Sequence, residues 1–86
     1  MGTNWTITLT GHSDEVMSAF YSPDGQRIIT ASHDQTIKIW DTKTGKEILT
    51  LVGHDNAVTS ASYSPDGQRI ISIGQDGTAR LYTTKN

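Results

Sequence analysis

Histidine, aspartate and hydroxyl side chains occur in this sequence in a combination that could carry out nucleophilic chemistry. They form two sets with the same spacing, His12, Thr30 and Asp34 in the first half and His54, Ser72 and Asp76 in the second half. In hydrolases a His takes the proton of a hydroxyl while an Asp holds the imidazole in place. A set that occurs twice at a fixed offset is more typical of a repeated structural unit than of an active site. We therefore expect that the protein is not an enzyme.

The elements that must position these sets are themselves repeated. Residues 3–44 align with residues 45–86 without a gap, and 20 of the 42 aligned pairs are identical. The stretch YSPDGQRII, for example, occurs at 21–29 and again at 63–71. A period of this length indicates a supersecondary unit that stacks on copies of itself. Residues 1–2, Met1 and Gly2, fall outside both units, and we interpret them as a start residue and a cloning glycine.

Each unit has the pattern of short antiparallel strands. Runs of Thr, Val, Ile and Tyr are interrupted by turn signals about every ten residues, which is typical of strands joined by tight turns. The Ser-Pro-Asp-Gly stretches at 22–25 and 64–67 predict β-turns. No segment combines a helical apolar period with caps at both ends. The sequence therefore predicts an all-β fold, with strands near residues 6–9, 16–21, 27–31, 36–40, 48–51, 58–63, 69–73 and 78–82.

Length, charge and composition restrict the classes of function. The chain has 86 residues, no Cys and a formal net charge of −2. A chain this short has only a marginal core of its own. The absence of a basic excess argues against nucleic acid or an anionic membrane as a partner, and no apolar run approaches the length of a membrane span. Because it has neither Cys nor a secretory signal, we expect a cytoplasmic protein, and we expect no cofactor.

No metal site is expected either. The three His residues are His12, His33 and His54, and no thiolate accompanies them. Their spacing supplies no geometry for zinc. The acidic residues lack the dense loop pattern of a calcium site.

Several of these motifs, recurring in register, resemble the WD40 repeat family. The first copy carries Gly11-His12, the turn at 22–25 and Trp40-Asp41, and the second carries Gly53-His54, the turn at 64–67 and Asp76-Gly77-Thr78. The resemblance covers essentially the whole chain, as one WD40 repeat at 3–44 and another at 45–86. It implies a β-propeller of four-stranded blades that acts as a platform for proteins or peptides rather than as an enzyme.

The resemblance also implies a structural role for the two His and Asp sets. In each repeat they would form a buried hydrogen-bonded tetrad that links turn, loop and strands. The tetrads would be His12, Thr30, Asp34 and Trp40 in the first copy and His54, Ser72, Asp76 and Tyr82 in the second. The second copy departs from the family pattern, because Tyr82-Thr83 stands in place of Trp-Asp. This departure puts the second tetrad in doubt.

In the WD40 family the sequence repeat is offset from the structural blade. The strand at 6–9 would then be an orphan outer strand of a preceding blade, and the next four strands would make one complete blade. The last three strands would make a blade that lacks its outer strand. The orphan strand and the vacancy are complementary.

Two blades cannot close a ring, since workable propellers have about 4–8 blades. A single chain would expose an unpaired strand edge and two apolar sheet faces. We therefore expect this chain, natural or engineered, to assemble with itself head-to-tail, as four chains with eight blades or, less favoured, three chains with six. The predicted seam consists of Trp5, Thr6, Ile7, Thr8 and Leu9 of one chain and Thr78, Ala79, Arg80, Leu81 and Tyr82 of the next.

An alternative hypothesis is an interaction scaffold that binds a peptide or protein on the rim of the closed ring. The resemblance places the candidate rim residues beside the Gly-His loops and the turn Asp residues. They are Glu15, Met17 and His33 in the first copy and Ala57, Thr59 and Gln75 in the second. Binding surfaces are usually rich in aromatic and Arg anchors, which this set lacks.

Overall fold

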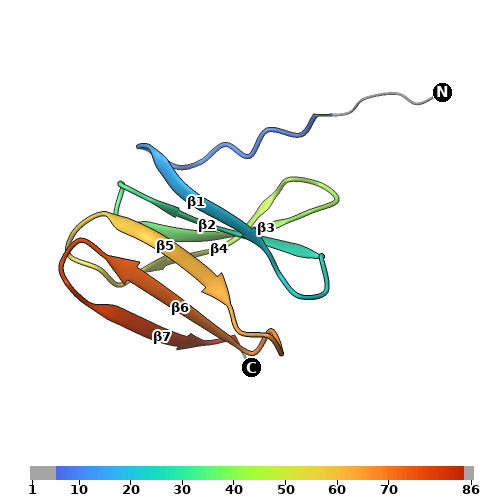
Figure 1. Ribbon diagram of the computed structural model, residues 1–86. Helices are drawn as coiled ribbons and strands as arrows, with labels where there is room; N and C mark the ends of the chain where they lie inside the picture. Colours follow the sequence, from blue (N-terminus) through green and yellow to red (C-terminus); the bar gives the residue numbers. More distant parts are fainter. Residues whose placement is uncertain (1–5, 85–86) are drawn as a thin grey trace.

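The computed structural model describes residues 6–84, which form seven β-strands joined by turns and loops (Figure 1). The strands are β1 (Val16–Tyr21), β2 (Arg27–Ser32), β3 (Thr36–Asp41), β4 (Glu47–Val52), β5 (Val58–Tyr63), β6 (Arg69–Gly74) and β7 (Ala79–Thr83). The all-β prediction is confirmed, and each of these strands lies within one residue of a predicted one. The described part of the chain contains no helix long and apolar enough to cross a membrane. The predictions for Met1, Gly2 and Trp5 concern residues outside the described part of the chain.

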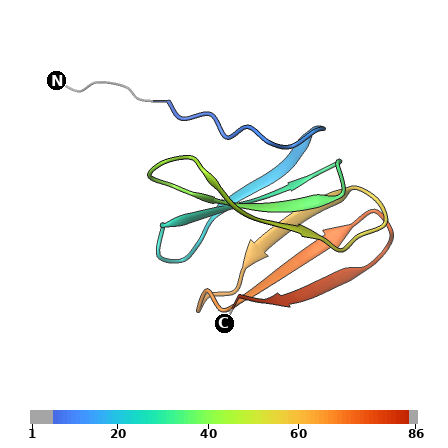
Figure 2. The ribbon, with the colours of Figure 1, turned by 180° about the vertical axis from the view of Figure 1, so that it is seen from behind.

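The strands form two antiparallel sheets that follow chain order. Sheet 1 contains four strands, β1-β2-β3-β4, and sheet 2 contains three, β5-β6-β7. This division matches the offset expected from the family pattern, with one complete four-stranded unit and one that lacks its fourth strand. The two sheets lie face to face, and β5 runs beside β1 and β2 (Figures 1 and 2).

The prediction of a strand at residues 6–9 is wrong for the single chain. Residues 6–10 belong to no strand and run from the start of β1 toward the β3–β4 hairpin (Figure 2). Ile7 lies there against Gly45, where an added Cβ would be 2.5 Å from the Ile7 Cγ2 atom. A strand needs a neighbour for its backbone N–H and C=O groups, and the described strands offer this segment none. The residue pattern of this segment favours a strand, but the segment has no pairing partner among the described strands.

The two Ser-Pro-Asp-Gly turns position the hairpins in the same way. In the first turn the Ser22 hydroxyl donates to Asp24 (2.6 Å), and the Gly25 amide donates to the Ser22 carbonyl (2.9 Å). Gly25 has a φ of +74°, a left-handed conformation that favours Gly. The second turn repeats these contacts between Ser64, Asp66 and Gly67. The predicted β-turns are therefore present in both copies.

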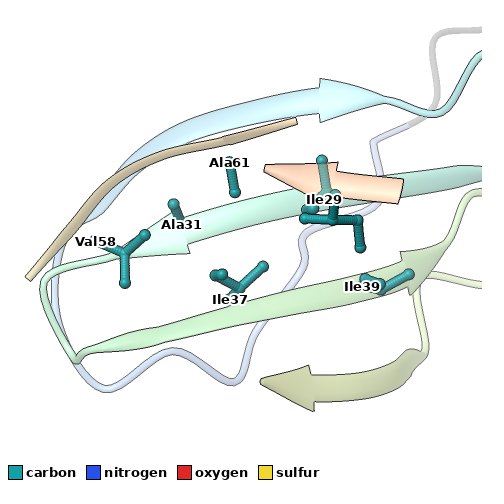
Figure 3. Close-up of a cluster of buried hydrophobic side chains, with 7 residues drawn as sticks. Ile29, Ala31, Ile37, Ile39, Val58 and Ala61 are labelled. Atoms are coloured by element: carbon teal, nitrogen blue, oxygen red, sulfur yellow. The ribbon is translucent and has the colours of Figure 1, made fainter. Parts of the chain in front are cut away.

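The core of the molecule is the layer between the two sheets (Figure 3). It consists of Ile29, Ala31, Ile37 and Ile39 from sheet 1 and Val58, Ala61 and Ile70 from sheet 2. The ladder of β2 and β3 pairs Ile29 with Ile39 and Ala31 with Ile37, so these four side chains share one face of sheet 1. Burial of this apolar face holds the two sheets together.

Candidate functional site

The first His and Asp set forms a continuous chain of hydrogen bonds on sheet 1. His12 lies before β1, and its Nδ1 atom is 2.8 Å from Asp34 Oδ2 in the β2–β3 turn. Its Nε2 atom is 2.6 Å from the Thr30 hydroxyl on β2. Trp40 on β3 donates its indole N–H to the same hydroxyl over 2.8 Å. With Nδ1–H directed at Asp34, Nε2 is left to accept the Thr30 proton.

Asp34 accepts hydrogen bonds from the end of its own turn and from the loop before β1. Its carboxylate accepts bonds from the amides of Ser13 (3.0 Å) and Thr36 (2.9 Å) and from the Thr36 hydroxyl. Burial alone would raise the pKa of this carboxyl, but the bonds from Thr36 and His12 outweigh burial and hold the pKa far below its ordinary value. Asp34 is therefore a fixed anion around which the turn is organised.

The second set is less complete. His54 Nδ1 lies 3.2 and 3.3 Å from the two Asp76 oxygens, and its Nε2 atom lies 2.7 Å from the Ser72 hydroxyl. The hydroxyl of Tyr82 is buried and has no hydrogen-bond partner within residues 6–84. The Tyr82 hydroxyl lies against Gly53, whereas the indole N–H of Trp40 donates to the Thr30 hydroxyl. Tyr82 thus lies at the Trp position of the second set but does not complete its hydrogen-bonded chain.

Asp76 is organised in the same way as Asp34. The Thr78 hydroxyl is the main cause that lowers the pKa of this carboxyl, and the amides of Thr78 and Asp55 contribute with His54. These bonds outweigh burial, which raises the pKa. The turn is thus fixed around an anion in both sheets.

The two hydroxyls are placed for packing rather than for attack on a substrate. Thr30 is 4% exposed and Ser72 is fully buried. Thr30 is in addition held between an imidazole and an indole N–H. A nucleophile must reach a substrate atom, and neither hydroxyl opens to solvent. Among residues 6–84, no group of three or more His, Asp or Glu side chains could hold a metal ion.

The outer face of sheet 2 is an exposed apolar surface. Ile71, Ile73 and Leu81 lie on it with 42%, 49% and 66% of their surface exposed. At an offset of 42 residues they correspond to Ile29, Ala31 and Ile39, which are 0%, 0% and 3% exposed between the sheets. The same face of the repeat is therefore buried in sheet 1 and bare in sheet 2.

The outer face of sheet 1 shows the reverse relationship. Val16 and Tyr21 are exposed there, whereas their counterparts Val58 and Tyr63 are buried and half-buried against sheet 1. Each end of the molecule thus presents the face that its counterpart buries in the middle.

The outer edge of sheet 2 is also available. Among the described strands, β7 pairs only with β6, whereas its counterpart β3 pairs with β2 and β4. The structure does not bring the two halves of the predicted seam together, because residues 6–9 lie on sheet 1 and β7 lies in sheet 2 (Figure 1). Thr78 lies in the turn before β7 rather than in the strand.

The predicted rim residues occupy matching places in the two repeats. The Glu15 carbonyl accepts the His33 amide, and the Ala57 carbonyl accepts the Gln75 amide, each over 2.9 Å. Glu15, Met17 and Gln75 are exposed, and His33 and Thr59 are partly exposed. Ala57 is only 4% exposed. It lies directly before β5 and presents little surface in the single chain, and its predicted place on the rim stays a prediction.

One feature of the structure had no counterpart in the sequence reasoning. A cavity of about 660 Å³ lies between the sheets beside Tyr82, lined among others by Ile39, Leu49, Leu51 and Ile70. It forms between the fourth strand of sheet 1 and the place where sheet 2 lacks one. The signal that could have indicated it is the change from Trp40 to Tyr82 at equivalent positions.

Comparison with known proteins identifies the repeat. The family described as "WD domain, G-beta repeat" (WD40) matches residues 4–41 and 45–83. Among curated proteins, the chain is 55% identical over 40 residues to the vegetative incompatibility protein HET-E-1 of Podospora anserina, covering 46% of this chain and 3% of that protein.

Two further relatives are similar over about half of this chain. A serine-threonine kinase receptor-associated protein of Dictyostelium discoideum is 41% identical over 46 residues, covering 54% of this chain and 16% of that protein. A probable E3 ubiquitin ligase complex SCF subunit sconB of Arthroderma benhamiae is 44% identical over 54 residues, covering 56% and 8%. The chain thus spans only a small part of the relatives it matches. Two repeat matches across nearly the whole chain show that it belongs to the WD40 repeat family.

Proposed function

We propose that this chain is a non-catalytic interaction module that forms a β-propeller by head-to-tail assembly of identical copies. The observation that carries this proposal is the reversed burial of equivalent faces. Sheet 2 leaves Ile71, Ile73 and Leu81 exposed where sheet 1 buries their counterparts, and sheet 1 leaves Val16 and Tyr21 exposed where sheet 2 covers theirs. A second copy that stacks its sheet 1 on the free face of sheet 2 would repeat the contact already made within one chain.

The geometry of such a contact is heterologous, because two different surfaces meet. Heterologous contacts continue until the rotation closes a ring, or they propagate as a filament. With two blades per chain, four copies give eight blades and three copies give six, both within the sizes that propellers adopt. We propose the tetramer as the favoured ring. Closure would remove both bare apolar faces and the open strand edge, which are otherwise sites of aggregation.

The position of residues 6–9 supports strand exchange at each seam. Ile7 and Leu9 line a hollow on sheet 1 together with Tyr21, Ile28, Asp41 and Thr42. At an offset of 42 residues, these six correspond to Leu49, Leu51, Tyr63, Ile70, Thr83 and Thr84, and all six line the cavity between the sheets. Residues 6–9 therefore lie against sheet 1 as β4 lies against sheet 2.

The equivalence of residues 6–9 with β4 suggests that this segment belongs to a blade of a neighbouring copy. Since β4 is the outer strand of the sheet stacked on sheet 2, residues 6–9 lie where the outer strand of a preceding blade belongs. When sheet 2 of a neighbouring copy stacks on sheet 1, its open β7 edge would lie next to this segment. The segment would then become the fourth strand of that sheet, with little movement.

The His and Asp sets fit a scaffold better than an enzyme. Each set ties a loop, a turn and two strands into one unit through buried hydrogen bonds, which specify the shape of the sheet. We infer that their role is to hold the blade rather than to act on a substrate.

The relatives suggest how a closed ring could be used. Among the similar proteins, one is named as a subunit of a ubiquitin ligase complex and one as receptor-associated. An assembled ring would present the rim that carries Met17 and His33, of which Met17 is 40% exposed. We propose protein or peptide binding there as a second function. Loss of binding in Met17→Asp, with the ring intact, would support it, and unchanged binding would contradict it.

Native mass spectrometry and light scattering test the assembly. We expect masses that are four or three times the 9.4 kDa of the chain. Ile71→Glu places a charge on the free face of sheet 2 and should release monomers. Gln68→Glu adds the same charge in the exposed β5–β6 turn and should assemble as the wild type does. A wild-type chain that stays monomeric at all accessible concentrations would refute self-assembly.

A further inference from the structure

The ladder of sheet 1 gives the register of the strand that would complete sheet 2. In sheet 1, β3 and β4 pair Trp40 with Glu47 and Lys38 with Thr50. At an offset of 42 residues, Tyr82 and Arg80 take the β3 positions, while Trp5 and Thr8 of a neighbouring copy take the β4 positions. We propose that Trp5 of one copy packs beside Tyr82 and Arg80 of the next copy and closes the cavity between its sheets. This inference rests on the proposed assembly.

The cavity has the position and the lining that an indole requires. Tyr82 shares with Ile70 the face of sheet 2 that looks toward sheet 1, and both line the cavity of about 660 Å³. A residue paired with Tyr82 on an added strand would share this face, because directly opposite residues in an antiparallel pair point to the same side. Ile39, Leu49 and Leu51 give the cavity apolar walls, and Arg27, Thr83 and Thr84 line it as well. Trp is the side chain that fills most volume and surface at such a place.

The unpartnered hydroxyl of Tyr82 points to the same occupant. This oxygen is buried and makes no hydrogen bond within the described residues. A buried polar atom without a partner costs about 1–3 kcal/mol. An indole carries one N–H donor at the edge of an otherwise apolar ring. Trp5 would therefore fill the space beside the Tyr82 ring and bring a donor close to its hydroxyl, which packs against Gly53 in the single chain.

The cationic residue on the third strand also differs between the two sheets, and the difference fits a change of its neighbour from Glu47 to Trp5. In sheet 1 the Lys38 ammonium lies 3.0 Å from Glu47 and donates to Thr50 over 2.9 Å. In sheet 2 the equivalent residue is Arg80, with a side chain that is 42% exposed and 4.0 Å from Asp76. Lys paired with Glu in one sheet thus becomes Arg paired with Trp at the seam. A guanidinium stacks on an aromatic face better than an ammonium does, so both changes favour a cation–π contact.

Fluorescence tests the placement of Trp5. Trp5→Phe leaves Trp40 as the single tryptophan, so the difference between wild type and this variant reports on Trp5 alone. As the concentration rises through the range of assembly, we expect the Trp5 emission to shift to shorter wavelength and to become shielded from acrylamide. Trp5 emission that remains exposed in the assembled protein would overturn the inference and leave the assembly intact. Shielding of equal extent in the monomer would also overturn it.

Affinity measurements test the contribution of the contact. Loss of a buried aromatic anchor should raise the dissociation constant of the seam by roughly 30-fold in Trp5→Ala. Trp5→Glu should also weaken assembly, because a carboxylate cannot fill the apolar space that the indole would occupy. Wild-type affinity in Trp5→Glu would contradict the inference, whereas a monomeric wild type would refute the assembly itself.

Discussion

Sheet 1 and sheet 2 have closely related sequences but differ in how far their structures are complete. Sheet 1 has four strands, and its Trp40 is buried at the end of an unbroken hydrogen-bonded chain. Sheet 2 has three strands, and its Tyr82 hydroxyl is unpartnered. The hairpin turns, by contrast, are the same in both sheets to within about 0.1 Å in their hydrogen bonds. Local sequence thus determines the turns, whereas neighbouring elements determine burial and completion.

One substitution inside the repeat contributes to the looser second set. Ser32 in sheet 1 donates its hydroxyl to the Asp14 carbonyl and accepts the Asp34 amide. Gly74 is its counterpart in sheet 2, and a Cβ added there would collide with the His54 ring. The absence of a side chain lets His54 lie closer to the strand. The turn then loses the hydroxyl that braces Asp34 in sheet 1.

Truncation of equivalent apolar residues should give the largest difference in stability between the two sheets. In the monomer, Ile39→Ala should lower the free energy of unfolding by about 2–5 kcal/mol, because Ile39 is 3% exposed in the core. Leu81→Ala should cost less than about 0.5 kcal/mol, because Leu81 is 66% exposed. Urea unfolding of dilute, monomeric protein measures both changes. Equal losses would mean that the two faces are not in different environments.

Exchange of the aromatic residues tests whether the Trp completes a sheet. Trp40→Tyr should lower the free energy of unfolding by about 1–3 kcal/mol, since Thr30 loses its indole donor and the buried ring becomes smaller. Tyr82→Trp should raise it by about 0.5–1.5 kcal/mol, the usual contribution of one new hydrogen bond. Thermal and urea unfolding measure both variants. A stabilising Trp40→Tyr substitution would contradict the role assigned to the indole.

Acid should destabilise both sheets through their turn carboxylates. The hydrogen bonds to Asp34 and Asp76 hold both pKa values well below the value of about 3.9 in the unfolded chain. A group with a depressed pKa stabilises the folded state above its unfolded pKa, and this contribution is lost as the pH falls below it. We expect the free energy of unfolding to fall from about pH 4 downward. Asp34→Asn and Asp76→Asn should each flatten this dependence, and an unchanged slope in both variants would contradict the assignment.

Much of the fold could be predicted because the same local sequence signals occur in both repeats. Pro, Asp and Gly fix the turns at 22–25 and 64–67, and the apolar alternation between them fixes the strands. The segment at residues 6–9 has the same alternation, but it forms no strand because a strand also needs a partner that this chain does not supply. Alternation predicts the potential of a segment to pair and not the presence of a neighbour.

The site was less accessible to sequence reasoning for the same reason. His12, Thr30, Asp34 and Trp40 could be grouped from the spacing of the motifs, and the structure places them in contact. The isolation of the Tyr82 hydroxyl, the burial of Ala57 and the cavity between the sheets depend on packing between different repeats. Such contacts join residues that no local pattern connects, so only the arrangement of the two sheets in space shows them.

The smallest expected difference lies in the turns between the second and third strands. Gln35 in sheet 1 has a φ of +75°, and Gly77 holds the equivalent position in sheet 2 with a φ of +83°. A left-handed conformation costs a non-Gly residue about 1 kcal/mol or more, whereas Gly adopts it freely. Gln35→Gly should therefore raise the free energy of unfolding by up to about 1 kcal/mol, and Gly77→Gln should lower it by a similar amount.

Urea unfolding of the two turn variants measures this pair as a matched exchange. Gln35 and Gly77 are both exposed, and an added Cβ at Gly77 meets no atom within 4 Å, so packing contributes little to either change. The two effects should then be opposite in sign and similar in size, because each variant alters only the backbone preference of one residue. Destabilisation by both substitutions would show that the side chain of Gln35 makes a contribution of its own. Opposite effects of similar size would show that the two turns differ at this position only in the backbone preference of one residue.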